Sequence, residues 1–225
     1  MKKYASPLIA ALLLLVTFNI DALAQRKKGK KAEKDQVEDP LKGVSLGSMA
    51  FRSIGPALTS GRIADIAVNP DNSNEFYVAA AAGGVWKTTN AGTTFEPIFE
   101  NYGSYSIGSL AMDPNNHSVL WVGTGENNNQ RSVSYGDGVY KSVDGGASFK
   151  KVGLDNSEHI GMIKVDPRNS DVVYVAATGP LWNAGGDRGL YKTTDGGKNW
   201  EKVLEISEHT GVNEIHLDPR NPDVL

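Results

Sequence analysis

The chain has 225 residues, a formal net charge of −3 and no cysteine. The lack of cysteine excludes a disulfide framework. Nucleic-acid-binding proteins usually carry an excess of basic residues, and the chain has no such excess, which argues against that class. Since 40% of the residues are hydrophobic, the chain can build a packed core of its own.

Residues 1–24 are typical of a secretory signal peptide. A charged start (Lys2 and Lys3) precedes an apolar stretch over residues 7–20, and small residues end at Ala24. This apolar stretch is too short for a bilayer core of roughly 30 Å, so cleavage is favoured over a membrane anchor. We therefore expect an exported protein, periplasmic, secreted or at the cell surface, with no stable membrane span after signal cleavage.

Residues 25–45 form a basic and then acidic run with hardly any apolar side chain. A segment of this composition cannot bury a core and predicts a disordered, charged linker. The other interpretation is a basic arm for nucleic acid or acidic lipid. The acidic residues in the same run argue against it, and no nucleic-acid partner is expected.

Three copies of one short pattern follow, and they set the repeat of the chain. They are KTTNAGTTF at residues 87–95 (box 1), KSVDGGASF at 141–149 (box 2) and KTTDGGKNW at 192–200 (box 3). Asn90, Asp144 and Asp195 hold equivalent positions about fifty residues apart, a period that indicates a repeat architecture.

A second marker, a turn with Asp or Asn before proline, recurs at Pro70, Pro114, Pro167 and Pro219. Each unit therefore reads as strand, proline turn, strand, variable loop, strand, box turn and short strand. Four antiparallel strands per unit without any helical pattern predict an all-β fold, a β-propeller of four-stranded blades. We expect the propeller over residues 46–225, with blades near 58–100, 101–153, 154–206 and, in part, 207–225.

The ring predicted in this way is incomplete, with about 3.5 blades. A closed ring typically takes four to eight blades. The last unit stops at Leu225, where the other units continue into a second strand. The sequence therefore favours the N-terminal part of a longer propeller.

The boxes are expected to be structural. Their acidic or amide side chain can accept hydrogen bonds within its own turn, glycine allows positive φ, and the closing aromatic is predicted to pack between neighbouring blades. Identical chemistry in every unit argues for scaffolding and against catalysis by the box carboxylates. The residues assigned to this role are Asn90, Gly92, Phe95, Asp144, Gly146, Phe149, Asp195, Gly197 and Trp200.

Strand direction sorts the connections onto two faces. The boxes and proline turns share a bottom face, whereas the longer loops share a top face, where binding residues are expected. These top-face segments are 58–62, 102–106, 126–138, 157–159, 180–188 and 207–209. The binding candidates in them are Arg62, Glu126, Arg131, Tyr135, Asp137, Glu158, His159, Trp182, Arg188, Glu208 and His209.

Two top-face segments repeat Ser-Glu-His, ending at His159 and His209. Glu beside His suits proton transfer or metal binding, but the other histidines lie elsewhere: His117 near a bottom-face turn and His216 inside a strand. We therefore expect no metal and no cofactor, and we assign the duplication to the repeat.

Residues 60–70, 123–146 and 176–197 resemble the large exported bacterial Asp-box (BNR-repeat) propellers. That group is similar to the sortilin N-terminal domain and to xyloglucanase-type glycoside hydrolases, and the resemblance covers residues 51–225. It implies the propeller fold, but its members include enzymes, receptors and assembly factors. The resemblance to xyloglucanases also implies a catalytic Asp before a Gly-Gly pair, and this chain has Ala81 there, so no catalytic residue is assigned.

The sequence thus favours an exported, non-catalytic propeller segment that binds a polypeptide or glycan through its top-face loops. The first alternative is a glycoside hydrolase, xyloglucanase-like or sialidase-like, whose catalytic residues lie partly beyond Leu225. Residues 51–56 resemble the start of sialidases in part, with Ser53 and Gly55 interrupting that motif. The second alternative is a structural or assembly factor. The oligomeric state is left open.

Overall fold

The structure is a computed structural model that describes residues 61–128 and 133–225. This part contains twelve β-strands and no helix, so no helix within it could cross a bilayer. The predicted signal peptide and linker, the first part of the 58–62 segment, and Arg131 all lie outside the described residues.

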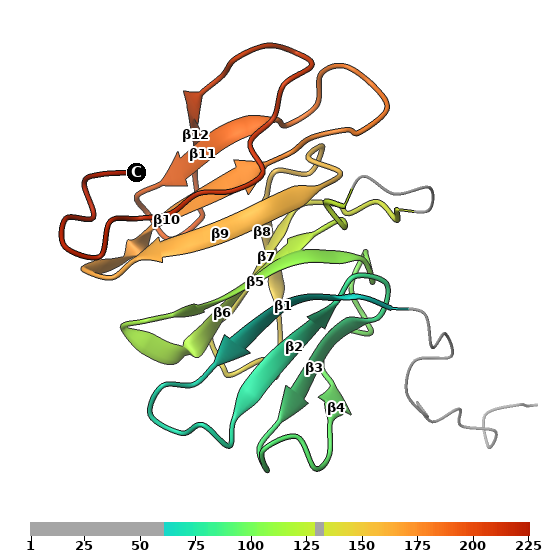
Figure 1. The fold of residues 1–225 in the computed structure, drawn as a ribbon, viewed down its shortest axis with the longest axis vertical. Coiled ribbons are helices and arrows are strands. Elements are labelled where there is room, and N and C mark those ends of the chain that lie inside the picture. Colours follow the sequence, from blue (N-terminus) through green and yellow to red (C-terminus); the bar gives the residue numbers. More distant parts are fainter. Residues whose placement is uncertain (1–60, 129–132) are drawn as a thin grey trace, which may run out of the picture. The chain divides into compact units, whose positions relative to one another are not determined.

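The strands form three antiparallel sheets of four strands each, in sequence order within each sheet (Figure 1). Blade 1 contains β1 (Ile63–Val68), β2 (Phe76–Ala80), β3 (Gly84–Thr88) and β4 (Glu96–Pro97). Blade 2 contains β5 (Ile107–Asp113), β6 (Asn116–Thr124), β7 (Val139–Ser142) and β8 (Lys150–Gly153). Blade 3 contains β9 (Ile160–Asp166), β10 (Asn169–Ala177), β11 (Gly189–Thr193) and β12 (Glu201–Leu204). This arrangement confirms the predicted partial β-propeller.

The inner strands β1, β5 and β9 of successive blades lie beside one another. Apolar side chains fill the space between the blades because each sheet has two apolar faces to cover. One core cluster, which includes Tyr77 and Ile107, joins blades 1 and 2. A second, which includes Trp121 and Ile160, joins blades 2 and 3.

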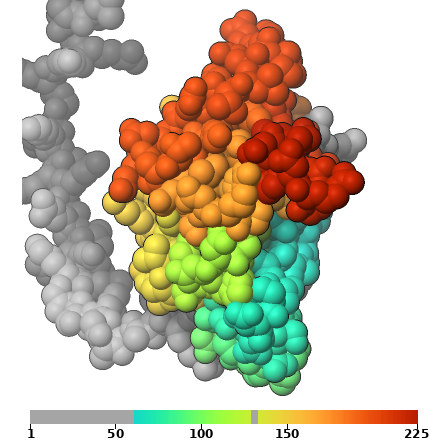
Figure 2. Space-filling model, turned by 90° about the vertical axis from the view of Figure 1, so that its left-hand side faces the viewer, coloured from blue at the N-terminus to red at the C-terminus, as the bar shows by residue number. Residues whose placement is uncertain are grey.

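The segment after β12 differs from the expectation of a fourth blade. Residues 211–217 form no strand and pair in no ladder, although the sequence pattern predicts one there. The segment packs instead on blade 3, where Val212 donates its backbone N–H to Ala177 O (3.0 Å) and Arg168 pairs with Asp223 (2.8 Å). Figure 2 shows the last residues, in dark red, against blade 3. Ile215 in this segment is 7% exposed because Tyr174, Ala176 and Leu190 cover it.

Each of the three boxes is closed by its own hydrogen bonds, which follow one pattern. In box 2, Ser142 Oγ donates to Asp144 Oδ1 (2.8 Å) and accepts from Gly146 N (2.9 Å), while Ser148 N and Oγ donate to the Asp144 carboxylate (2.9 and 2.6 Å). Equivalent bonds close box 3 through Thr193, Asp195, Gly197 and Asn199. Box 1 closes in the same way through Thr88, Asn90, Gly92 and Thr94, except that its amide Asn90 Nδ2 donates to Thr94 Oγ1 (2.9 Å). The box side chains are thus occupied within their own turns.

The boxes lie next to the proline turns of the same blades, so both sit on the bottom face. Gly145 N of box 2 donates to Ser118 O (2.8 Å), and Gly196 N of box 3 donates to Asp171 O (3.0 Å).

The aromatic residues that close the boxes pack differently in the three blades. Phe149 packs edge-on against Phe99 and Trp200 against Trp121, both from the preceding blade.

Phe95 departs from this pattern. It is 42% exposed and packs against Phe76 of its own blade. The described residues begin at Gly61 and include no earlier blade for the Phe95 ring to contact. The expected inter-blade position is therefore seen for Phe149 and Trp200 and not for Phe95.

Box 2 provides a test of the structural role. The bonds from Ser148, with a further bond from Ser142, lower the pKa of Asp144 to about 2. A carboxyl whose pKa is lowered by folding stabilises the native state above its unfolded pKa near 3.8, and this contribution disappears as the pH falls towards 2. Asn90 closes box 1 as an amide, so Asp144→Asn is expected to fold normally at pH 7 and to lose less stability than the parent between pH 4 and pH 2.

The measurement is thermal unfolding across this pH range. Asp155→Asn removes an exposed carboxylate outside the boxes and serves as the control. Identical pH profiles of the parent and Asp144→Asn would show that the box carboxylate does not stabilise the fold.

Candidate functional site

The top face is built from the lead-in residue of each blade and the end of its second strand. Arg62 O accepts from Ala81 N (2.9 Å), and His159 O accepts from Thr178 N (3.0 Å). Between them, Ser106 O accepts from Gly125 N (2.7 Å). The equivalent bond in each blade places the predicted top-face segments at one end of the sheets, opposite the boxes.

Glu126, directly after Gly125, is 2% exposed. It is not the free loop carboxylate that the sequence suggested. Arg62 donates to its Oε1 through Nε (2.6 Å) and Nη2, and Asn128 Nδ2 donates to the same oxygen (3.2 Å). Its backbone N–H donates to Ser106 Oγ (3.0 Å). The Arg62–Glu126 ion pair therefore fixes the top-face loop of blade 2 to the lead-in of blade 1.

His159 lies beside this carboxylate and is fully buried. Its ring is 5.5 Å from the Tyr135 ring, at an interplanar angle of 50°. Burial lowers the pKa of His159, against the opposing effect of Glu126, so the imidazole is neutral at pH 7. Within residues 61–128 and 133–225 both ring nitrogens and the neighbouring Ser157 Oγ lack a hydrogen-bond partner. A neutral imidazole carries one donor and one acceptor, and at this buried position neither faces solvent.

Three exposed aromatic side chains lie in the top-face segments 102–106, 126–138 and 180–188. Tyr105, Tyr135 and Trp182 are 58%, 55% and 59% exposed. The Tyr105 hydroxyl lies 3.4 Å from Ser134 Oγ, which places it beside the loop that carries Tyr135. Tyr105 was not among the sequence candidates. An aromatic residue in a short polar connection was the signal that could have identified it.

Two predicted binding residues hold structural positions instead. Arg188 is buried and donates to Gly185 O (2.8 Å), Pro180 O and Asn183 O (both 2.7 Å), so it holds its own loop together. Asp137 accepts a hydrogen bond from the Tyr140 hydroxyl (2.6 Å). The pKa of Tyr140 is raised mainly by burial and to a smaller extent by this bond. Guanidinium groups satisfied by loop carbonyls are not available to a ligand.

The remaining candidates are Glu158, Glu208, His209 and Arg131. The Glu158 backbone adopts a φ of 54°, and its carbonyl accepts from Gly136 N (2.7 Å). Glu208 and His209 are exposed and lie 3.4 Å apart. Arg131 lies outside the described residues. No group of three or more metal-binding side chains is found in residues 61–128 and 133–225.

No protein-family model matches the chain. A xyloglucanase from Paenibacillus sp is 31% identical over 154 residues, which are 66% of this chain and 14% of that protein. A probable oligoxyloglucan-reducing end-specific xyloglucanase from Neosartorya fischeri is 28% identical over 156 residues, 61% of this chain and 17% of that protein. The crystal structure of an ancestral GH74 enzyme superposes with a TM-score of 0.53 at 25% identity, over 68% of this chain and 20% of that one.

These similarities support a β-propeller of the glycosyl hydrolase-like kind. The chain spans between 14% and 17% of the length of these two curated relatives. The closer assignment to sortilin-like or BNR-repeat proteins stays a prediction from the sequence.

Proposed function

We propose that this chain is the glycan-binding part of a glycoside hydrolase-like β-propeller, with a neutral polysaccharide of the xyloglucan type as its ligand. The observation that carries the proposal is the exposure of three aromatic side chains, Tyr105, Tyr135 and Trp182, in three of the top-face segments. Aromatic faces offer large, rigid and amphipathic contact area, which suits the apolar faces of sugar rings. The similarity to xyloglucanases supports this ligand class.

Binding without catalysis is assigned to this segment for a chemical reason. Glycoside hydrolysis uses two carboxylates that flank the scissile bond. Ala81 replaces the carboxylate that the resemblance to xyloglucanases implies, and it is buried. Glu126, the buried top-face carboxylate, is held by Arg62. The second candidate function is glycoside hydrolysis by a longer protein that contains this chain. The similarity of this chain to xyloglucanases favours that function. The signal-like residues 1–24 support export of the protein.

The proposal is tested by measuring binding of the 225-residue chain to polysaccharides by affinity electrophoresis. The parent chain is expected to be retarded in gels that contain xyloglucan. Tyr135→Ala combined with Trp182→Ala should weaken binding about tenfold, because each ring contributes on the order of 0.5–1.5 kcal/mol. Phe95→Ala, which removes an exposed ring from the bottom face, is the control and should bind like the parent.

Unretarded migration in xyloglucan, or equal retardation of parent and double variant, would contradict glycan binding through this face. Capture of a polypeptide by the same face, without glycan binding, would favour a polypeptide as the ligand of the top-face loops. Release of sugar by the chain alone would contradict the non-catalytic assignment.

A further inference from the structure

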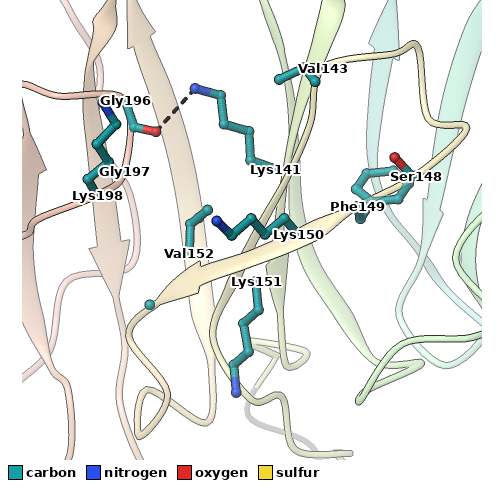
Figure 3. Close-up of a pocket in the computed structure, with 11 residues that line it drawn as sticks. Lys141, Val143, Ser148, Phe149, Lys150, Lys151, Val152, Gly196, Gly197 and Lys198 are labelled. Carbon is teal, nitrogen blue, oxygen red and sulfur yellow. Dashed lines mark hydrogen bonds between the residues drawn. The ribbon is translucent and has the colours of Figure 1, made fainter.

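A groove of about 690 Å³ lies between blades 2 and 3, away from the top face. Strands β7 and β8 of blade 2 form one wall, and the box 3 turn of blade 3 forms the other (Figure 3). Its apolar surface comes from Val143, Phe149 and Val152. The residues that carry charge in its lining are all lysines: Lys141, Lys150, Lys151 and Lys198.

Three of these lysines leave a positive charge without a paired carboxylate. Lys141 lies opposite Lys150 in the β7–β8 ladder, and Lys198 projects from box 3 on the other side. Within residues 61–128 and 133–225 no ion pair involves these three side chains. Lys141 Nζ donates to Gly196 O (3.1 Å) and lies 4.6 Å from the Trp121 ring centroid, while Asp171 and Asp113 act on its charge from farther away. Two like charges opposite each other destabilise a sheet unless an anion offsets them.

The fourth lysine is occupied. Lys151 pairs with Asp155 (3.1 Å) and Asp137 (3.5 Å), and in Figure 3 its side chain points away from the groove. It therefore does not contribute its charge to the space between Lys150 and Lys198.

The repeat shows that this charge pattern is specific to blade 2. At the equivalent position of the strand ladder, Lys87 lies opposite Glu96 in blade 1 and Lys192 lies opposite Glu201 in blade 3. Blade 2 has Lys150 in place of glutamate, so it lacks the carboxylate that balances the other blades. Box 3 adds Lys198 at a position that is not basic in boxes 1 and 2.

The geometry points to a second binding site, in which this groove takes a uronic acid residue of an acidic polysaccharide. The carboxylate would lie between Lys150 and Lys198, with Lys141 behind them, and the apolar face of the sugar ring would lie on Val143 and Val152. Each uronic acid residue carries one carboxylate, which a small group of lysines can neutralise. The chain as a whole has a net charge of −3, which disfavours binding of a densely charged polyanion such as nucleic acid. This site is independent of the proposed top-face function, because the two lie on different parts of the blades.

The test measures binding of an oligogalacturonide to the 225-residue chain by isothermal titration calorimetry at two salt concentrations. Lys150→Glu installs the residue that blades 1 and 3 carry at this position, so the variant is expected to fold, and its melting temperature checks this. Binding should fall about tenfold or more, because a charge-assisted contact is replaced by repulsion. Binding by the parent should weaken as salt rises.

The matched control is Lys150→Glu combined with Glu201→Lys, which has the net charge of the parent but places the lysine pair in blade 3. Weak binding by this double variant supports the groove, and restored binding would overturn it by showing that net charge alone acts. Equal binding by the parent and Lys150→Glu would also overturn the site. Equal affinity for inorganic phosphate or for a neutral oligosaccharide would overturn the uronic acid assignment. Xyloglucan retardation is measured separately, so failure of one site leaves the other distinguishable.

Discussion

Trp121→Ala is expected to lower the free energy of unfolding by about 3–5 kcal/mol, the usual cost of removing a buried tryptophan. Trp121 is fully buried, packs edge-on against Trp200 at 6.3 Å and receives the Lys141 cation on its face. The box 3 turn also closes over it, because a Cβ on Gly197 would lie 3.0 Å from the indole. The substitution would therefore leave a cavity where two blades meet.

The measurement is chemical denaturation followed by circular dichroism. The Trp121 Nε1 has no hydrogen-bond partner within the described residues, so the loss includes no broken hydrogen bond of the indole. Trp182→Ala removes the same side chain from an exposed position and should change stability by less than about 0.5 kcal/mol. Similar losses for the two variants would contradict the inter-blade core described above.

Gly125→Ala is expected to cost about 3 kcal/mol and to disturb the candidate site as well. Gly125 has a φ of 86°, in the region that side chains disfavour. A Cβ there would overlap the carbonyl of Glu158 and lie 2.8 Å from Gly136 N, and both obstacles are backbone atoms that cannot rotate away. Because Glu126 follows directly, relief of this overlap would displace the Arg62–Glu126 pair.

Gly61→Ala is the control for this substitution, since a Cβ at Gly61 meets nothing within 4 Å. Unfolding free energies and xyloglucan retardation would be measured for both variants. A Gly125→Ala protein as stable as Gly61→Ala would contradict the close approach of the blade 2 loop to the lead-in of blade 3.

The blades could be predicted from the sequence because their determinants are local. Each box uses a side chain and the backbone four residues on, as Asp195 does with Asn199, so the pattern fixes the turn without any distant contact. The continuous apolar runs in β6 and β10 likewise indicate strands that are covered on both faces.

The site was harder to predict because its contacts join distant positions. Arg62 and Glu126 are 64 residues apart, and a polar, Asn-rich loop gave no sign that Glu126 is buried. Arg188 looked like a ligand contact from its loop composition, yet three carbonyls of that loop occupy it. Residues 211–217 have a strand-like sequence but no later strand to pair with in the described structure, so local propensity alone did not produce a ladder.

Fluorescence quenching of Trp182 by acrylamide tests the central claim most directly. The chain has four tryptophans, and of these Trp182 is the exposed one, so comparison with Trp182→Phe isolates its signal. A xyloglucan oligosaccharide at saturating concentration is expected to protect Trp182 from acrylamide, whereas an oligogalacturonide, which we place in the groove of blade 2, should leave its quenching unchanged. If the quenching of Trp182 by acrylamide is unchanged at a saturating concentration of xyloglucan oligosaccharide, glycan binding on the top face is contradicted.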